Sequence, residues 1–81
     1  MEQITNQHRS LSDIATDSIR DAIIRGDFKM GQAVTEAALS LSLNISKTPV
    51  REALSKLESE GLVISEKNKG YRIFSLTKQE Y

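Results

Sequence analysis

The residues of this chain best suited to chemistry form a polar and basic edge near its centre. Lys47, Arg51 and Ser55 recur at i, i+4 and i+8, which places them on one side of a helix, and Ser46 and Thr48 lie beside Lys47. An arginine on such an edge can donate two hydrogen bonds to the O6 and N7 atoms of guanine. Amino and hydroxyl groups at a helix N-terminus, where backbone N–H groups lack partners, bind phosphate. These five residues therefore predict contact with double-stranded DNA.

A simpler interpretation of the same edge stays open. Arg51 could form an ion pair along the helix with Glu58 or with neighbours of Ser55, and then carry no function. Ser46 has a typical N-cap side chain, and capping is the role that we expect first for its hydroxyl group. DNA contact remains the favoured interpretation of Arg51 because of the sequence motif that surrounds it.

A second cluster of cations follows in the C-terminal part of the chain. It lies between two β-prone segments and contains Lys67, Asn68, Lys69, Gly70 and Arg72. Asn and Gly favour tight turns, so the pattern predicts a β-hairpin with a basic tip. Such a tip can approach the minor groove or the sugar–phosphate backbone closely. An ordinary hairpin turn would explain Asn68 and Gly70 but would leave the three cations without a role.

Catalytic and metal-binding chemistry finds little support. The chain has no cysteine, and its one histidine, His8, lies near the N-terminus. Asp13, Asp17 and Asp21 recur at i, i+4 and i+8, but carboxylates spread over more than two helical turns are too far apart to share one ion. No nucleophile–base pair and no Gly-rich phosphate loop is present. We therefore expect no enzyme activity, no metal site and no cofactor.

The face opposite the basic edge is apolar and must hold that edge in place. This stripe consists of Val50, Ala53, Leu54 and Leu57, at i, i+3, i+4 and i+7. Pro49 suits the first turn of a helix, and Gly61 suits the position after its end. We expect one amphipathic helix over residues 47–60, with the stripe in the core and the basic edge exposed.

Two further helices are predicted before it. Residues 10–25 begin with Ser10 and Asp13 in a capping-box arrangement and end before Gly26. Their predicted core stripe is Leu11, Ile14, Ala15, Ser18, Ile19, Ala22 and Ile23. Residues 36–43 follow the N-cap Thr35. In this second helix we expect Ala38, Leu39 and Leu43 to be buried.

The connections complete a winged helix-turn-helix. Asn44 tolerates the left-handed backbone that a tight helix–helix turn demands. Residues 32–34 form a possible short strand, and residues 62–66 and 71–74 form the hairpin, or wing. Phe28 and Met30 are expected to pack inward. The predicted fold is mainly α with a small antiparallel β-hairpin wing.

Length and charge limit the possible classes of protein. Eighty-one residues without cysteine make one small domain with no disulfide. The net charge is zero, but residues 46–72 hold six basic and four acidic residues, whereas residues 1–45 hold four and six. The basic excess therefore lies with the candidate DNA contacts. The N-terminus is polar and the apolar runs are short, so we expect neither a signal peptide nor a membrane span, and a soluble, cytoplasmic protein.

Several motifs together resemble the N-terminal domain of the GntR family of bacterial transcription regulators. The resemblance covers about residues 10–77 and rests on Val34-Thr35-Glu36, Leu43-Asn44-Ile45-Ser46-Lys47-Thr48, Pro49-Val50-Arg51-Glu52-Ala53-Leu54, Glu60-Gly61-Leu62-Val63 and Asn68-Lys69-Gly70. The closest similarity is to the branch with an all-helical C-terminal ligand-binding domain. Three positions depart from the family pattern, namely Met30, Ala37 and Lys47. Lys47 loses the bidentate recognition that arginine would give, which concerns the operator sequence rather than DNA binding.

This resemblance implies a function and an organisation. The implied function is sequence-specific binding to double-stranded DNA as the operator-reading domain of a ligand-responsive regulator, with repression as one mode. It implies a homodimer on a pseudo-palindromic operator and a small-molecule effector bound by a C-terminal domain. The expected organisation is a disordered tail over residues 1–9, the DNA-binding domain over 10–76, and the start of a linker or helix over 77–81.

A different class of function also stays open. A winged-helix module that binds protein without binding DNA would fit the zero net charge and the departures at Lys47 and Ala37. The two functions differ in their response to salt, because binding through several cations to phosphates weakens steeply as salt rises.

Overall fold

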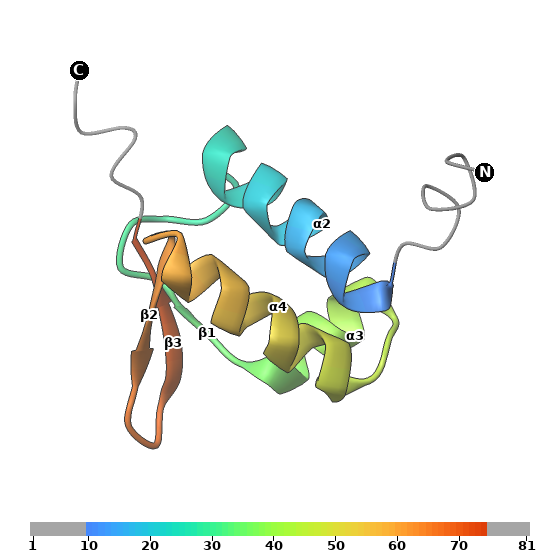
Figure 1. Cartoon of the computed structure of the whole chain (residues 1–81). Helices are drawn as coiled ribbons and strands as arrows, with labels where there is room; N and C mark the ends of the chain where they lie inside the picture. The colour runs from blue at the N-terminus through green and yellow to red at the C-terminus, as the bar shows by residue number, and fades with distance from the viewer. Residues whose placement is uncertain (1–9, 75–81) are drawn as a thin grey trace.

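The computed structural model describes residues 10–74 as three helices and a three-stranded sheet (Figure 1). The helices are α2 (Leu11–Arg25), α3 (Glu36–Leu43) and α4 (Lys47–Ser59), and the strands are β1 (Ala33–Val34), β2 (Val63–Glu66) and β3 (Gly70–Ile73). The predicted winged helix-turn-helix is confirmed, with helix bounds within one residue of those expected. The expectations for the N-terminal tail and for residues 77–81 fall outside the described residues.

Local signals set the ends of the helices. Ser10 Oγ accepts a hydrogen bond from the Asp13 N–H at 3.1 Å, and the Asp13 carboxylate accepts one from the Ser10 N–H at 3.4 Å, so the capping box is present. Thr35 Oγ1 accepts from the Ala38 N–H at 3.1 Å at the start of α3. Asn44 adopts a left-handed φ of 60° after α3, which turns the chain directly into α4.

The sheet has the strand order β1-β3-β2, and both pairs are antiparallel. Tyr71 in the central strand pairs with Val34 on one side and with Ser65 on the other. The possible strand at residues 32–34 is real but only two residues long, and it joins the wing as a third strand. The wing is therefore anchored to the segment that leads into α3.

The core lies where α2, α3 and the sheet meet α4. Its buried apolar residues are Ala15, Ile19, Ile23, Val34, Leu39, Val50, Ala53, Leu54, Leu57, Leu62, Val63 and Ile73. Helix α2 packs along one side of α4, and the wing projects beyond α4 on another (Figure 1). Among the helices of residues 10–74, none is long and apolar enough to cross a membrane.

Some residues that were expected in the core are exposed instead, namely Leu11, Ile14, Ser18, Met30 and Ala38. On α2 the buried line is narrower than the predicted stripe, so Leu11 and Ile14 lie at its rim, each about half exposed. Helix α3 buries Leu39 as expected, but it buries Ser40 in place of Ala38. Met30 stands in the loop before β1, where the core offers it no cover. Apolar spacing identified these elements correctly but set the buried face too wide.

Candidate nucleic-acid interface

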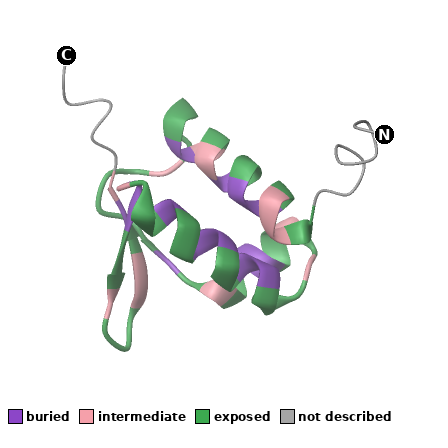
Figure 2. Cartoon of the chain, viewed as in Figure 1, coloured by how far each residue is buried: buried purple, intermediate pink, exposed green. Residues whose placement is uncertain are grey.

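Helix α4 has the two faces that its sequence predicts. Val50, Ala53, Leu54 and Leu57 have no exposed surface, whereas Lys47, Arg51 and Ser55 are exposed. Ser46 and Thr48 are exposed as well, at the start of the helix. Figure 2 shows this division along α4 as alternating exposed and buried turns of the ribbon. All five predicted residues are thus gathered on the accessible side of one helix.

Ser46 occupies the N-cap position, but its hydroxyl group does not cap. Its backbone is extended, with ψ of 171°, and its side chain makes no capping hydrogen bond to α4. The expected side-chain role is therefore wrong, although the position is right. The hydroxyl group at the N-terminus of α4 is left available to an external acceptor such as phosphate.

Arg51 is held by a carboxylate from the neighbouring helix. Its Nε donates to Glu36 Oε2 at 3.1 Å, and its Nη2 donates to Glu36 Oε1 at 3.2 Å. This two-point contact raises the pKa of Arg51, first through the hydrogen bonds and then through the negative charge of Glu36. The Arg51 side chain is still 60% exposed, whereas that of Glu36 is 27% exposed. The ion pair along α4 with Glu58, considered as an alternative, is not formed.

The pairing with Glu36 was missed by sequence reasoning. Glu36 and Arg51 are separated by 15 residues, so no helical periodicity connects them. A helix-turn-helix joins two neighbouring helices through a short turn, so contacts between them were to be expected, but the sequence does not say which side chains meet.

The wing tip carries two lysines, and both side chains are accessible. Lys67, Asn68 and Lys69 are exposed, and the Lys69 N–H closes the turn on the Glu66 carbonyl at 3.0 Å. Asn68 takes the positive φ of 63° that the turn requires, as expected. Over residues 10–74, the side chains of Lys47, Lys67 and Lys69 form no ion pair or hydrogen bond. Their charges are therefore available to an anionic partner.

Gly70 and Arg72 have structural tasks in the sheet. Gly70 has φ of +84°, and a Cβ atom there would lie 2.7 Å from the Val34 carbonyl oxygen. Arg72 belongs to the central strand, where its Nε donates to Glu66 Oε2 and its Nη1 to the Gly31 carbonyl, both at 2.8 Å. The structure thus places Lys67 and Lys69 at the tip and Arg72 behind it.

A side-chain contact ties the wing to α4. The Glu58 carboxylate accepts a hydrogen bond from Ser65 Oγ at 2.9 Å and a longer one from the Ser65 N–H at 3.4 Å. Tyr71, opposite Ser65, is partly buried against the core. Burial raises the pKa of its phenol, and the charges of Glu36 and Glu58 raise it further. The contact therefore joins the wing to the helix that carries the basic edge.

Comparison with known proteins agrees with this arrangement. The model of the gntR family of bacterial regulatory proteins matches residues 11–73. The chain belongs to the GntR family. It is the DNA-binding domain of a transcriptional regulator of that family, which is a family of regulators and not of enzymes.

Individual relatives are similar over the same segment. The chain is 34% identical over 64 residues to the HTH-type transcriptional regulator YdhC of Bacillus subtilis, covering 79% of this chain and 29% of that protein. It is 37% identical over 62 residues to the HTH-type transcriptional repressor GlaR of Escherichia coli, covering 76% and 28%. A crystal structure of a GntR-family regulator from Pseudomonas syringae superimposes with a TM-score of 0.75 at 31% identity, covering 86% and 30%. The chain thus spans less than a third of each of these proteins.

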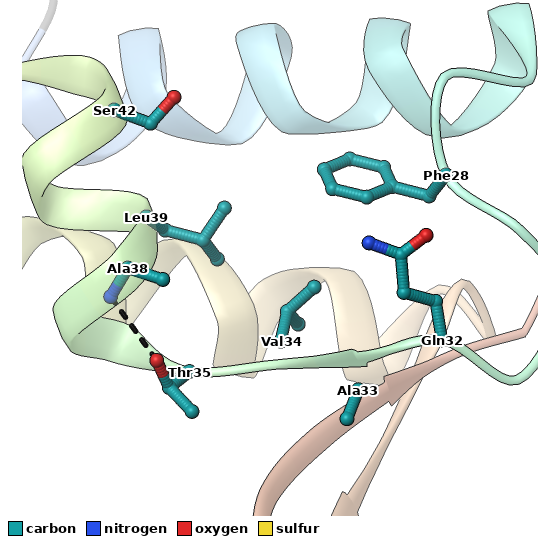
Figure 3. Close-up of a pocket in the computed structure, with 8 residues that line it drawn as sticks. All are labelled: Phe28, Gln32, Ala33, Val34, Thr35, Ala38, Leu39 and Ser42. Carbon is teal, nitrogen blue, oxygen red and sulfur yellow. Dashed lines mark hydrogen bonds between the residues drawn. The ribbon is translucent and has the colours of Figure 1, made fainter.

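The GntR domain also contains an apolar pocket, which lies apart from the basic edge. It has a volume of about 350 Å³ and opens between the α2–β1 loop, β1 and α3. Phe28 and Leu39 face each other across it, with the Gln32 amide and the Ser42 hydroxyl at its sides (Figure 3). Of the eight lining residues none is charged, so the pocket offers no positive charge to a phosphate.

The acidic residues of the GntR domain form no metal centre in the part that the structure describes. No group of three His, Cys, Asp or Glu side chains close enough to hold a metal ion occurs between residues 10 and 74. The Asp17 carboxylate instead accepts from Arg20 Nη1 at 2.9 Å.

Proposed function

We propose that the GntR domain reads an operator by placing the exposed edge of α4 in the major groove and the wing tip at the adjacent minor groove. The observation that carries this proposal is the exposure of Lys47, Thr48 and Arg51 on the side of α4 opposite its buried stripe. In this arrangement Arg51 contacts a base edge, and Lys47 with the N-terminus of α4 contacts phosphate. Lys67 and Lys69 contact the backbone flanking the minor groove.

The distribution of partners explains how a chain of zero net charge can bind an anion. Glu36, Glu58 and Glu66 each accept a hydrogen bond from a neighbouring side chain, and those of Glu36 and Glu66 come from arginines. Their charges are therefore offset or turned toward the protein. The three lysines of the interface have no such partner among residues 10–74, so no carboxylate in that part of the chain pairs with their positive charges.

The proposal extends to the organisation of the whole regulator. We infer a homodimer on a pseudo-palindromic operator and a small-molecule effector bound outside the DNA-binding domain, in an all-helical C-terminal domain. The support is the family resemblance, together with the greater length of the relatives, of which the matched segments are 29% and 28%. A single domain covers one half-site, so its affinity should be weak without the dimer.

An amide NMR titration of the labelled chain with a generic duplex at low salt tests the docking. Chemical-shift changes are expected at residues 46–55 and at Lys67–Lys69, and they should reverse as salt is raised. Helix α2 serves as the internal control and should not respond. No changes, or changes confined to α2, would refute this docking and favour the protein-binding module.

A further inference from the structure

The Arg51–Glu36 contact suggests how the domain separates its operator from other DNA. We propose that Glu36 is a specificity-determining residue, which fixes the orientation of Arg51 and offsets its charge toward phosphates. This inference rests on the proposed reading of DNA by α4. Without this role, the negative charge of Glu36 would only weaken the attraction of α4 for DNA.

The contact with Glu36 uses only part of the Arg51 guanidinium group. A guanidinium group carries five N–H donors in one plane. Glu36 takes one hydrogen from Nε and one from Nη2 of Arg51, which occupies one edge of that plane. The outer edge, with both hydrogens of Nη1 and the second hydrogen of Nη2, makes no hydrogen bond to residues 10–74. Two parallel donors on that edge match the O6 and N7 atoms of guanine, so fixing the inner edge prepares the outer one.

The position of Glu36 in the fold favours its negative charge. It stands in the first turn of α3, directly after the N-cap Thr35, where the helix dipole favours a negative charge. Its side chain is less exposed than that of Arg51. Tyr71 from β3 lies close enough to both side chains to feel their charges. The pair therefore joins two helices, and its two hydrogen bonds restrict the rotation of the Arg51 side chain.

Few other side chains can replace Arg51. Residues 36–59, which hold both helices of the helix-turn-helix, contain no second arginine, and position 37 is an alanine. The other cation at the start of α4 is Lys47, which lacks the planar fork. Bidentate recognition of guanine by this motif thus depends on Arg51. The orientation of the Arg51 side chain therefore determines whether guanine is recognised.

Glu36 also offsets the positive charge of Arg51. An arginine that is free to reach phosphates binds any sequence, and each phosphate that it neutralises adds about 0.9 to the slope of log K against log salt. A carboxylate bonded to the same guanidinium offsets that attraction on all sequences alike. The oriented outer edge still gains two hydrogen bonds, but only where guanine is present. Glu36 therefore lowers generic affinity more than operator affinity.

Selection from a random duplex library tests this inference. The wild-type chain, Glu36→Gln, Glu36→Asp and Arg51→Ala are each used to enrich binding sequences. Dissociation constants are then measured for the wild-type-selected duplex and for the unselected library. Glu60→Gln is the matched control, because Glu60 forms the same two-point contact with Arg20 at the other end of α4, at 2.9 and 2.7 Å. It changes the net charge by the same amount.

Glu36→Gln is expected to bind the unselected library about two- to fivefold more tightly, with a steeper salt dependence. Its preference for the selected duplex over the library should fall about tenfold, with the guanine position losing most of its information. Glu36→Asp keeps the charge but is too short for the two-point contact, so it should retain weak library binding and lose guanine preference. Glu60→Gln should match the wild type in all these measurements.

Two results would overturn the inference, and they differ from failure of the proposed function. If Glu36→Gln keeps the wild-type preference and salt slope while Arg51→Ala loses the preference, Arg51 reads DNA without help from Glu36. If Glu60→Gln changes as much as Glu36→Gln, net charge alone is responsible. If the wild-type chain binds the unselected library at low salt but enriches no sequence, operator reading itself is refuted. Circular dichroism spectra and thermal midpoints of each variant verify that it is folded.

Discussion

At the scale of single residues, arginines and lysines have divided roles in this domain. Each of the four arginines between residues 10 and 74 bonds a carboxylate, namely Arg20, Arg25, Arg51 and Arg72. The lysines of the same part of the chain form no such ion pair. A planar fork suits fixed geometry, whereas a flexible, strongly hydrated ammonium group suits a diffuse attraction to phosphates. The arginines therefore form fixed contacts within the fold, and the lysines provide the diffuse electrostatic attraction to phosphates.

This division predicts different outcomes for the cations of the wing. Replacing both Lys67 and Lys69 by alanine should lower the slope of log K against log salt by up to about 0.9 for each phosphate that is no longer neutralised, and leave folding stability unchanged. Arg72→Ala should do the reverse. It should cost about 0.5–1.5 kcal/mol of unfolding free energy, because its hydrogen bonds to Glu66 and the Gly31 carbonyl are removed, and barely alter the slope. Fluorescence anisotropy across salt concentrations and urea unfolding measure the two effects. A large change of slope in Arg72→Ala would assign that side chain to the DNA.

Replacing Gly70 by alanine should destabilise the domain, and the same replacement at Gly61 is the control. Gly70→Ala must adopt φ of +84° and place its Cβ 2.7 Å from the Val34 carbonyl oxygen. Gly61→Ala adopts nearly the same φ, +83°, but its Cβ would meet no atom within 4 Å. We expect Gly61→Ala to cost about 1–2 kcal/mol from backbone conformation alone, and Gly70→Ala clearly more. Equal losses in urea unfolding would mean that the contact between β3 and β1 relaxes without cost.

At the scale of elements, the sequence was sufficient wherever the determining signals are local. Capping residues, apolar spacing and turn residues gave the bounds of the three helices and of the wing to within a residue or so, because each depends on atoms a few positions apart. Exposure of Ala38 and Met30 was not foreseen, since it depends on where whole elements lie. The same holds for the partners of Arg51 and Ser65, which cross between elements. Thus the candidate residues were predictable, but the contacts that orient them were not.

One such contact, between Ser65 and Glu58, helps to hold the wing against α4. Ser65→Ala removes the 2.9 Å hydrogen bond to Glu58 and should cost about 0.5–1.5 kcal/mol of unfolding free energy. It should also weaken DNA binding, although Ser65 is not a proposed DNA contact, because the wing tip loses its fixed place. Ser59→Ala is the control: its Oγ donates to the Lys56 carbonyl at 2.6 Å within α4. Amide exchange in β2 and DNA affinity should change only in Ser65→Ala, and equal behaviour of both variants would argue against the anchor.

At the scale of the whole molecule, an arginine–glutamate ion pair with two hydrogen bonds lies near each end of α4. Glu36 binds Arg51 on the side proposed to face DNA, and Glu60 binds Arg20 of α2 at the opposite end. Only the second pair joins α2 to the end of α4, across 40 residues of sequence. A small core without disulfides gains from such a link, because α2 packs on α4 along one side only. The Arg20–Glu60 pair thus contributes to stability, whereas the Arg51–Glu36 pair is the one proposed to act in recognition. Each pair can be removed without removing the other.

The Arg20–Glu60 link makes the stability of the domain sensitive to acid. The hydrogen bonds from Arg20, and then its charge, lower the pKa of Glu60 in the folded chain, against the opposing effect of partial burial. Unfolding restores the ordinary value of about 4.3, so the unfolded chain binds the proton more tightly. The link therefore contributes fully at neutral pH, and its contribution is lost as pH falls below the ordinary value and through the lowered one.

In Glu60→Gln this acid-dependent contribution is absent. The variant should be less stable than the wild type by about 0.5–1 kcal/mol at pH 7, and the difference should shrink steadily as the pH is lowered through the carboxylate range. Urea unfolding at a series of pH values measures it. Other carboxylates titrate in both chains, so the difference between the two curves isolates Glu60. A difference that is constant with pH would show that the glutamine disturbs packing and that the ion pair contributes nothing.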